Sequence, residues 1–536
     1  MLSTTLPTSK EKWLRFGLRV AALLAALGAF SALAPRVLAA DGVDPLNDPA
    51  IGLNVMWMLI AGFLVFFMQA GFALVEAGFT RAKNVAHTMM MNIMVFCIGA
   101  LGYWLTGFAL QFGAVNFTYP AVGAAAAWAH SPTTLGDLAG LLSTPLLRFG
   151  QVGLLGGSGF MLLGVGANVA VLSFFLFQMV FMDTAATIPT GSMAERLKFG
   201  GFVLMGLWVS MFIYPLVGGW VWGGGWLQNL GRFAGLGNGA VDFAGSGVVH
   251  MIGGTLALVG AIVIGPRIGR FNKDGSANAM PGHNIPMGIL GTIILFFGWF
   301  GFNPGSSLAF MGAGRVLAVS AAINTLLAGA AGGIAAMTLM WLVGPSKKPD
   351  PGLSVNGVLA GLVAITASCA FVDTPAAVLI GLIAGVLVCA ATFGLEKLQI
   401  DDPVGAVPVH FVNGLWGVLA VGIFANGNPV TDGWNGVAGP VRGLLYGGSS
   451  QIVAQGLEAV SVIAVVGGLS YVFFRVLSRL KLLRSEPAHE LHGLDLPEMG
   501  VPGYTNVDVL MPGGNFRTPR PAIRPAGIAA TISTLK

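Results

Sequence analysis

Eleven apolar segments, each long enough to cross a lipid bilayer, constrain this chain more than any other feature. They lie near residues 52–77, 86–112, 166–189, 199–222, 244–266, 286–309, 315–343, 353–372, 375–398, 404–425 and 452–476. A bilayer core of about 30 Å takes about 20 residues of helix, and in it each segment must satisfy its own backbone groups. Only 9% of the 536 residues are charged, which is too few for the surface of a soluble protein. The sequence therefore predicts an all-α polytopic membrane protein with 11 transmembrane helices.

The ends of the chain differ in composition from the apolar part. Residues 1–40 are expected to be a signal peptide, because basic residues precede an apolar run from Val20 to Ala34 and Val37-Leu38-Ala39 offers a cleavage site. An uncleaved extra helix is the alternative, which the shortness of the run disfavours. Residues 41–480 are expected to form the transmembrane domain. Residues 481–536 are expected to be a cytoplasmic tail that is disordered after about residue 504, where Pro and Gly become frequent.

The distribution of basic residues gives the orientation. If the mature N-terminus lies outside, four basic residues fall in outer connections: Arg148, Arg232, Arg315 and Arg442. Fourteen fall in cytoplasmic connections and the start of the tail: Arg81, Lys83, Arg196, Lys198, Arg267, Arg270, Lys273, Lys347, Lys348, Lys397, Arg475, Arg479, Lys481 and Arg484. Basic residues concentrate on the cytoplasmic side of membrane proteins, so the bias predicts N-out and C-in. The one long outer connection, roughly 113–165, is expected to hold a short interfacial helix.

Two stretches repeat one spacing in a region that is poor in polar residues. Asp242 to His250 and Asp402 to His410 share Asp, Gly, Val and His at the same offsets. The first stretch opens a helix that runs inward and the second opens one that runs outward. Eight residues of helix rise about 12 Å, so each histidine would reach mid-membrane from the opposite side. This predicts two inverted five-helix repeats plus helix 11, with the histidines paired between them. The alternative is two histidines that are separately satisfied by backbone carbonyls.

The composition disfavours other classes of function. Ionisable groups inside a membrane are costly and usually mark a path for ions or protons, which favours transport. Cys97, Cys369 and Cys389 lie in apolar segments without metal-like spacing, so they are expected to be packing residues. The sequence shows no nucleophile constellation or phosphate-binding loop. We therefore expect no enzyme activity, cofactor, metal ion or nucleic-acid partner.

Five longer motifs are more specific. They are Glu76-Ala-Gly-Phe-Thr-Arg-Ala-Lys-Asn84, Ala194-Glu-Arg-Leu-Lys-Phe199, Asp242 to His250, Gly298-Trp-Phe-Gly-Phe-Asn-Pro-Gly-Ser306 and Gly493-Leu-Asp495. They resemble signature stretches of the ammonium transporter family (Amt/Mep, related to Rh proteins), and the resemblance runs from about residue 50 to 504. It implies an Amt-type member in a bacterial inner (plasma) membrane, assembled as a homotrimer with one pore in each subunit. The family's twin histidines fall on His250 and His410, the pair that the spacing also predicts.

The same resemblance assigns an outer site. Trp222 matches a vestibule tryptophan and Ser306 a vestibule serine, and together with Asp242 they are expected to recruit the ammonium ion. A cation over an indole face gains about 0.5–2 kcal/mol. Without the resemblance, Trp222 would be assigned to the interfacial aromatic belt. Asp242 either raises the local affinity for cations and helps to accept the proton, or caps its helix and holds the vestibule loop, and we favour the structural and electrostatic role. For Asp402 on the opposite side, capping is the favoured role.

Below this site the resemblance places a phenylalanine gate. Phe181 and Phe302 match the stacked pair that closes the family's pore, although position alone would assign them to core packing. Phe177 and Gln178 are expected to line the vestibule one turn before Phe181. A dry constriction excludes hydrated ions, because removing water from a charge costs many kcal/mol.

These assignments predict an ammonium transporter. The pore would bind NH₄⁺ at the outer vestibule, deprotonate it and conduct NH₃ past the twin histidines, with separate transfer of the proton and net electrogenic uptake. Methylammonium is a second candidate substrate, and membrane lipid and a cytoplasmic P-II-type regulatory protein are the expected partners. Two alternatives remain open. One is an ammonium sensor that signals through a separate partner, and the other is an Rh-like neutral channel for NH₃ or CO₂.

Overall fold

The computed structural model describes residues 49–115, 142–164, 169–431 and 439–504. The expected signal peptide (1–40) and the tail beyond residue 504 lie outside these ranges. The chain divides into a unit of residues Met1–Gly503 and a second unit of Tyr504–Lys536, and all the elements below belong to the first.

Every predicted apolar segment contains a helix. In chain order the spans are α2 (Pro49–Phe79), α3 with η3 and α4 (Val85–Gly102, Tyr103–Gly107, Phe108–Phe112), α7 (Val169–Ser192), α8 with η6 and α9 (Phe199–Trp208, Val209–Ile213, Tyr214–Val221), η7 with α11 (Ser246–Met251, Ile252–Ile264), α12 with η8 (Ile285–Phe302, Pro304–Ser307), α13 (Ala313–Val343), α14 (Pro351–Ile365), α15 (Thr374–Lys397), η9 with α16 (Val407–Val412, Asn413–Phe424), and α17 with η13 and α18 (Gln451–Ser461, Val462–Val466, Gly467–Arg479).

Shorter elements connect these spans. They are η2 (Ala82–Asn84), β1 (Pro145–Phe149), β2 (Val152–Gly156), η5 (Phe160–Leu162), α10 (Leu230–Ala234), η10 (Pro429–Thr431), η12 (Leu444–Tyr446), α19 (Pro487–His492) and η14 (Asp495–Met499).

The predicted all-α membrane fold is confirmed, with one span shorter than expected. Within the described ranges ten helices are long and apolar enough to cross a membrane, and α14 is a shorter apolar helix. In the segment expected at 353–372 the helix ends at Ile365, because the carbonyl groups that follow accept hydrogen bonds from other segments. The carbonyls of Cys369 and Val372 accept hydrogen bonds from Asn324 Nδ2, both at 2.8 Å. The carbonyls of residues 366 and 367 accept from the backbone that leads into η7.

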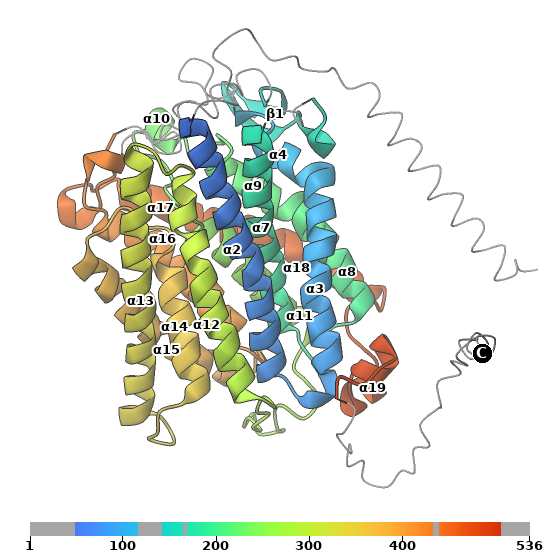
Figure 1. The fold of residues 1–536 in the computed structure, drawn as a ribbon. Helices are drawn as coiled ribbons and strands as arrows, with labels where there is room; N and C mark the ends of the chain where they lie inside the picture. The colour runs from blue at the N-terminus through green and yellow to red at the C-terminus, as the bar shows by residue number, and fades with distance from the viewer. Residues whose placement is uncertain (1–48, 116–141, 165–168, 432–438, 505–536) are drawn as a thin grey trace, which may run out of the picture. The chain divides into compact units, whose positions relative to one another are not determined.

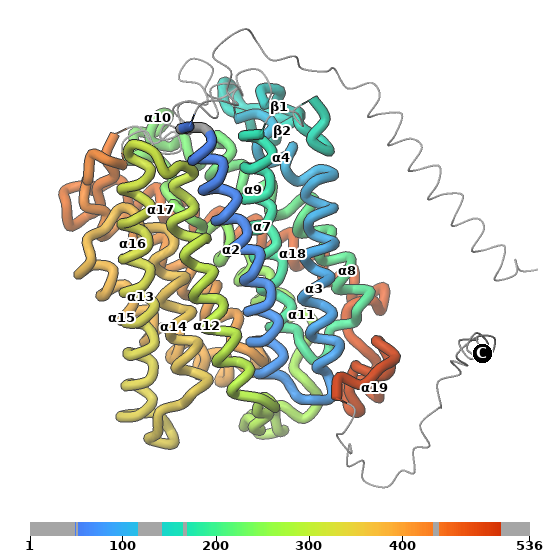
Figure 2. The backbone as a smooth tube through the Cα atoms, viewed as in Figure 1, coloured from blue at the N-terminus to red at the C-terminus, as the bar shows by residue number. Residues whose placement is uncertain are grey.

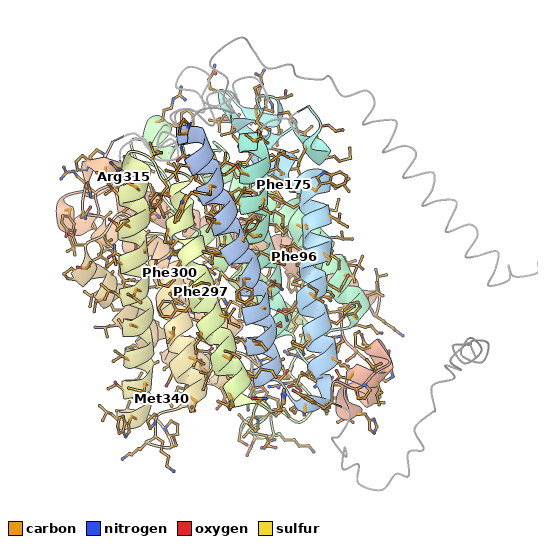
Figure 3. The ribbon with its side chains drawn as sticks, viewed as in Figure 1. Phe96, Phe175, Phe297, Phe300, Arg315 and Met340 are labelled. Carbon is orange, nitrogen blue, oxygen red and sulfur yellow. The ribbon has the colours of Figure 1, made fainter. Side chains whose placement is uncertain are left out.

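Small residues allow the helices to pack closely. Figure 1 shows α2 and α12 side by side along much of their length. At their contact a methyl group on Gly71 would lie 3.0 Å from the carbonyl oxygen of Gly291, so only glycine fits there. The outward faces are apolar: Phe297 of α12 is 55% exposed, and Figure 3 shows it with Arg315 and Met340, which lie at opposite ends of α13. Such a face suits contact with lipid or another apolar surface.

The two ends of the helical unit carry different elements. Most of the stretch expected to hold the interfacial helix (113–165) lies outside the described residues; in 142–164, β1 and β2 form an antiparallel hairpin beside α4, followed by the short η5. Figure 2 shows this hairpin at one end and α19 at the other. At the end that carries α19, the tail contacts the N-terminal end of α3. Asp495 Oδ1 accepts from His87 N at 2.9 Å, and Leu494 N donates to Asn84 Oδ1 at 2.9 Å. The start of the tail is therefore part of the folded unit.

Candidate functional site

Asp242 organises the turn that leads into the first histidine. Its carboxylate accepts hydrogen bonds from the backbone N–H groups of Gly245 (3.0 Å), Gly247 (3.0 Å) and Val248 (2.9 Å). Gly245 has a φ of 107°, a left-handed conformation that favours glycine. The turn opens η7, a six-residue π-helical segment that carries His250. The geometry is that of a cap, the role favoured from sequence.

Asp402 builds the same turn in the second half of the chain. Its carboxylate accepts from Gly405 N at 3.1 Å and Val407 N at 2.7 Å, and Gly405 has a φ of 82°. This turn leads into η9, a second six-residue π-helical segment, which carries His410. Burial raises the pKa of the Asp402 carboxyl. The repeat seen in the sequence is therefore a repeat of local structure, and π-helical turns of this kind are frequent at functional sites.

The two histidines meet in the interior of the helical unit. Their Nδ1 atoms are 3.1 Å apart, and the two rings are 21° from parallel. One Nδ1 must donate and the other accept, so the neutral pair holds one proton between the rings. His250 is fully buried, and His410 is 5% exposed. Their helices approach closely because Gly254 has no side chain: a methyl group there would lie 2.2 Å from Phe411 N.

An aromatic stack lies on one side of the pair. Phe181 and Phe302 are stacked, with ring centroids 4.0 Å apart, and the Phe302 ring lies 5.4 Å from that of His250. Trp299 stacks on His250 at 5.2 Å, and its Nε1 donates to Thr366 Oγ1 at 3.0 Å. Sequence reasoning missed Trp299, although it lies within the motif that ends at Ser306. A tryptophan in a run of aromatic residues gave no sign that it would face a histidine.

The residues expected to recruit a cation lie beyond this stack. The Trp222 ring lies 6.1 Å from that of Phe181, and its Nε1 donates to the Asp242 carbonyl at 2.7 Å. This bond fixes the indole against the Asp242 turn. Ser306 follows Phe302 by one turn, and its hydroxyl donates to the Phe302 carbonyl at 2.8 Å. The structure thus places Trp222 and Ser306 at the same end of the Phe181–Phe302 pair.

The two expected lining residues are consecutive on α7, so their side chains point about 100° apart around the helix. The Phe177 ring is 4.6 Å from that of Phe181 and fills the space left by Gly305. Gln178 is buried, and its Oε1 has no hydrogen-bond partner in the described part of the chain. A buried acceptor without a donor is costly. Gln178 is therefore suited to accept from a bound molecule.

A buried ion network supports the site from the inner side. Arg267 donates to both oxygens of Asp401 (2.8 and 2.9 Å) and to Glu195 Oε1 (2.8 Å), and Arg81 pairs with Glu195 Oε2 at 2.5 Å. Burial would raise the pKa of Asp401, but its bonds with Arg267 outweigh burial and lower that pKa to about 2. Burial lowers the pKa of Arg196 to about 10. The network joins the end of α7 to the residues that precede Asp402.

The chain is similar to known proteins over most of its length. Residues 56–504 match the model of the Ammonium Transporter Family. The chain is 42% identical over 480 residues to ammonium transporter Amt2 of Archaeoglobus fulgidus, with 88% of this chain and 93% of that protein covered. Among solved structures it resembles a protein titled "Sensor Amt Protein", with a TM-score of 0.70, 35% identity, and 84% and 98% coverage. It also resembles Mep2 of Candida albicans, with a TM-score of 0.65, 25% identity, and 81% and 86% coverage.

Proposed function

Because the chain belongs to the ammonium transporter family, we propose that it moves ammonium across a membrane. The path passes the Phe181–Phe302 pair and then the two histidines, His250 and His410. The observation that carries the proposal is the buried His250–His410 pair, with Nδ1 atoms 3.1 Å apart, directly beyond the Phe302 ring. A proton-exchanging pair behind an apolar constriction suits a substrate that can bind as a cation and cross as a neutral molecule.

Recruitment takes place at Trp222 and Ser306. Ammonium is a small cation and a hydrogen-bond donor, so it gains from an indole face and from an oxygen acceptor. Trp222 supplies the ring, held by its bond to the Asp242 carbonyl, and Ser306 supplies the oxygen. Phe177 and Gln178 line the same vestibule, where the Gln178 Oε1 is a further acceptor. The Asp242 carboxylate acts from behind as a fixed negative charge.

Entry into the pore strips the ion of water. Phe181 and Phe302 leave an apolar constriction that offers no replacement for a hydration shell. Desolvation penalises the charged form, so ammonium gives up its proton and ammonia passes. The imidazoles then accept hydrogen bonds from ammonia and relay the separated proton, since each ring can donate at one nitrogen and accept at the other. Both species cross, and the net movement is electrogenic.

Replacing His250 by alanine is the test of this mechanism. We expect the transient current after an ammonium jump, recorded from proteoliposomes on a solid-supported membrane, to fall at least about a hundredfold, because a positioned proton-transfer group contributes about 10²- to 10⁴-fold. His492→Ala is the matched control, since His492 is exposed on the tail, and it should leave the current unchanged. Ammonia-driven pH changes without any current in the parent protein would instead establish a neutral channel.

A sensor is the second candidate, favoured by the resemblance to the protein titled "Sensor Amt Protein". Signalling would require a separate partner on the cytoplasmic side. Ammonium binding to the purified protein, with neither current nor ammonia flux in proteoliposomes, would support the sensor and contradict the transporter.

The chain is a multi-pass membrane protein, and we place it in a bacterial inner (plasma) membrane as a homotrimer regulated by a P-II-type protein. The exposed apolar faces of α12 and α13 would then be shared between lipid and neighbouring copies. Native mass spectrometry from detergent should give three times the subunit mass. A monomeric mass that persists on dilution and concentration would contradict the assembly.

A further inference from the structure

The carboxyl group of Glu76 lies beyond the second histidine, past a row of four neighbouring rings: Phe302, His250, His410 and Phe72. The Phe302 ring is 5.4 Å from that of His250, His250 is 5.2 Å from His410, and His410 is 6.2 Å from Phe72 of α2. Glu76 lies four residues after Phe72, so it occupies the same face of α2 one turn closer to the cytoplasmic end. Glu76 thus lies one turn past Phe72, on the inner side of the twin histidines.

Its surroundings fix the carboxyl between three elements. Glu76 is 3% exposed. Its Oε2 accepts from Asn92 Nδ2 of α3 at 2.9 Å, and its Oε1 accepts from Thr190 Oγ1 of α7 at 2.7 Å. A methyl group on Gly191 would lie 3.3 Å from Glu76 Oε1 and 2.4 Å from Val404. The carboxyl therefore borders the Asp402–His410 turn, which holds the second histidine.

A purely structural tie does not require a carboxyl here. Within the described ranges no basic side chain forms an ion pair with Glu76, and a charge without a countercharge is costly inside a membrane. An amide at this position would still join α2, α3 and α7 by hydrogen bonds. What the carboxyl adds is the ability to gain and lose a proton. The two donors from Asn92 and Thr190 stabilise the ionised form, which is the form able to accept one.

Other buried carboxyls are less suited to that role. Asp402 is the acidic neighbour of Glu76, but its carboxylate forms the backbone turn that leads into η9, through the N–H groups of Gly405 and Val407, and is therefore assigned to capping. Asp183 faces Gly99 of α3. In the described part of the chain, Glu76 combines burial, two side-chain donors and a position one turn past Phe72, whose ring lies 6.2 Å from that of His410.

We propose that Glu76 is the inner proton acceptor of the transport path, a role that rests on the proposed function. An N–H bond of the His410 imidazolium breaks, and the proton passes through water of the inner lumen to form an O–H bond on the Glu76 carboxylate. The acid then releases the proton to cytoplasmic water and the carboxylate is restored. Ammonia crosses beside it as a neutral molecule and needs no such acceptor.

The substitution Glu76→Gln separates proton transfer from the passage of ammonia. The glutamine keeps the size of the side chain and one acceptor oxygen, but its amide cannot take up and release a proton. We expect the ammonium-jump current to fall at least about tenfold, while ammonia conduction, followed as a pH change inside vesicles, stays close to that of the parent. Glu76→Asp keeps the carboxyl and should retain a measurable part of the current.

Thr190→Val is the control for a structural role. It removes one of the two hydrogen bonds to the carboxylate but leaves the proton-exchanging group in place, so the current should fall less than in Glu76→Gln. An undiminished current in Glu76→Gln would overturn the proposal, and so would an equal loss in Thr190→Val. A parent protein without current would overturn proton transfer altogether, including the role of His250, whereas a parent current that Glu76→Gln does not change would remove Glu76 alone.

Discussion

Asp242→Ala is expected to abolish transport and to destabilise the protein, because one carboxylate holds the turn on which both the outer site and the first histidine depend. Removing it leaves the N–H groups of Gly245, Gly247 and Val248 buried without an acceptor. Each such group costs about 1–3 kcal/mol, so the turn cannot persist in its present form. Trp222 would lose the fixed carbonyl to which it donates, and His250 would lose its register against His410.

Asp242→Asn is the graded control. Its single carbonyl oxygen can still accept from part of this set, so we expect an intermediate loss of thermal stability and of ammonium-jump current. Asp242→Glu keeps the charge but moves it by one methylene, which tests whether geometry or charge matters more. A capping role predicts that the asparagine variant retains more activity than the glutamate variant. Full transport in Asp242→Ala would contradict the role of the turn.

The residues that could be predicted from sequence are those that repeat or that interrupt an apolar run. The spacing shared by Asp242–His250 and Asp402–His410 predicted two similar turns and a meeting of the histidines, and both occur. The eleven apolar segments predicted eleven helices, because a single segment in a bilayer satisfies its backbone hydrogen bonds by forming a helix. Phe181 and Phe302 could be singled out only through the family resemblance, because the chain has 35 phenylalanines and their positions alone do not distinguish these two.

Features that depend on contacts between distant segments could not be predicted. The early end of α14 arises because Asn324 takes the carbonyls of Cys369 and Val372, and nothing in the local sequence of α14 indicates this. Trp299 stacks on a histidine 49 positions earlier in the chain, which no periodicity encodes. The hairpin in residues 142–164 was not predicted; two apolar runs pair across Gly150, which has a φ of 57°.

Arg267→Ala is expected to cause the largest loss of stability among substitutions outside the pore. Arg267 is the shared partner of Asp401 and Glu195, and all three side chains are buried. Removing one partner of a buried ion pair costs about 3–5 kcal/mol, because the remaining charge stays in a poor solvent. Glu195 keeps Arg81, but Asp401 loses the guanidinium that donates to both of its oxygens. Thermal unfolding in detergent should show the difference.

The dependence on pH identifies the cause. In the parent, the pKa of Asp401 is lowered to about 2, so its contribution to stability is complete above the ordinary aspartate value and is lost as the pH falls through about 2. In Arg267→Ala the buried carboxyl loses its closest partner and keeps the more distant guanidinium of Arg270 at 3.6 Å, so its ionisation is less well compensated and opposes folding as the pH rises. The difference in unfolding free energy should therefore be larger near pH 7 than near about pH 4. Lys198→Ala breaks an exposed pair with Glu486 and should cost less than about 1 kcal/mol at either pH. A difference that does not change with pH would assign the effect of Arg267 to packing instead of charge.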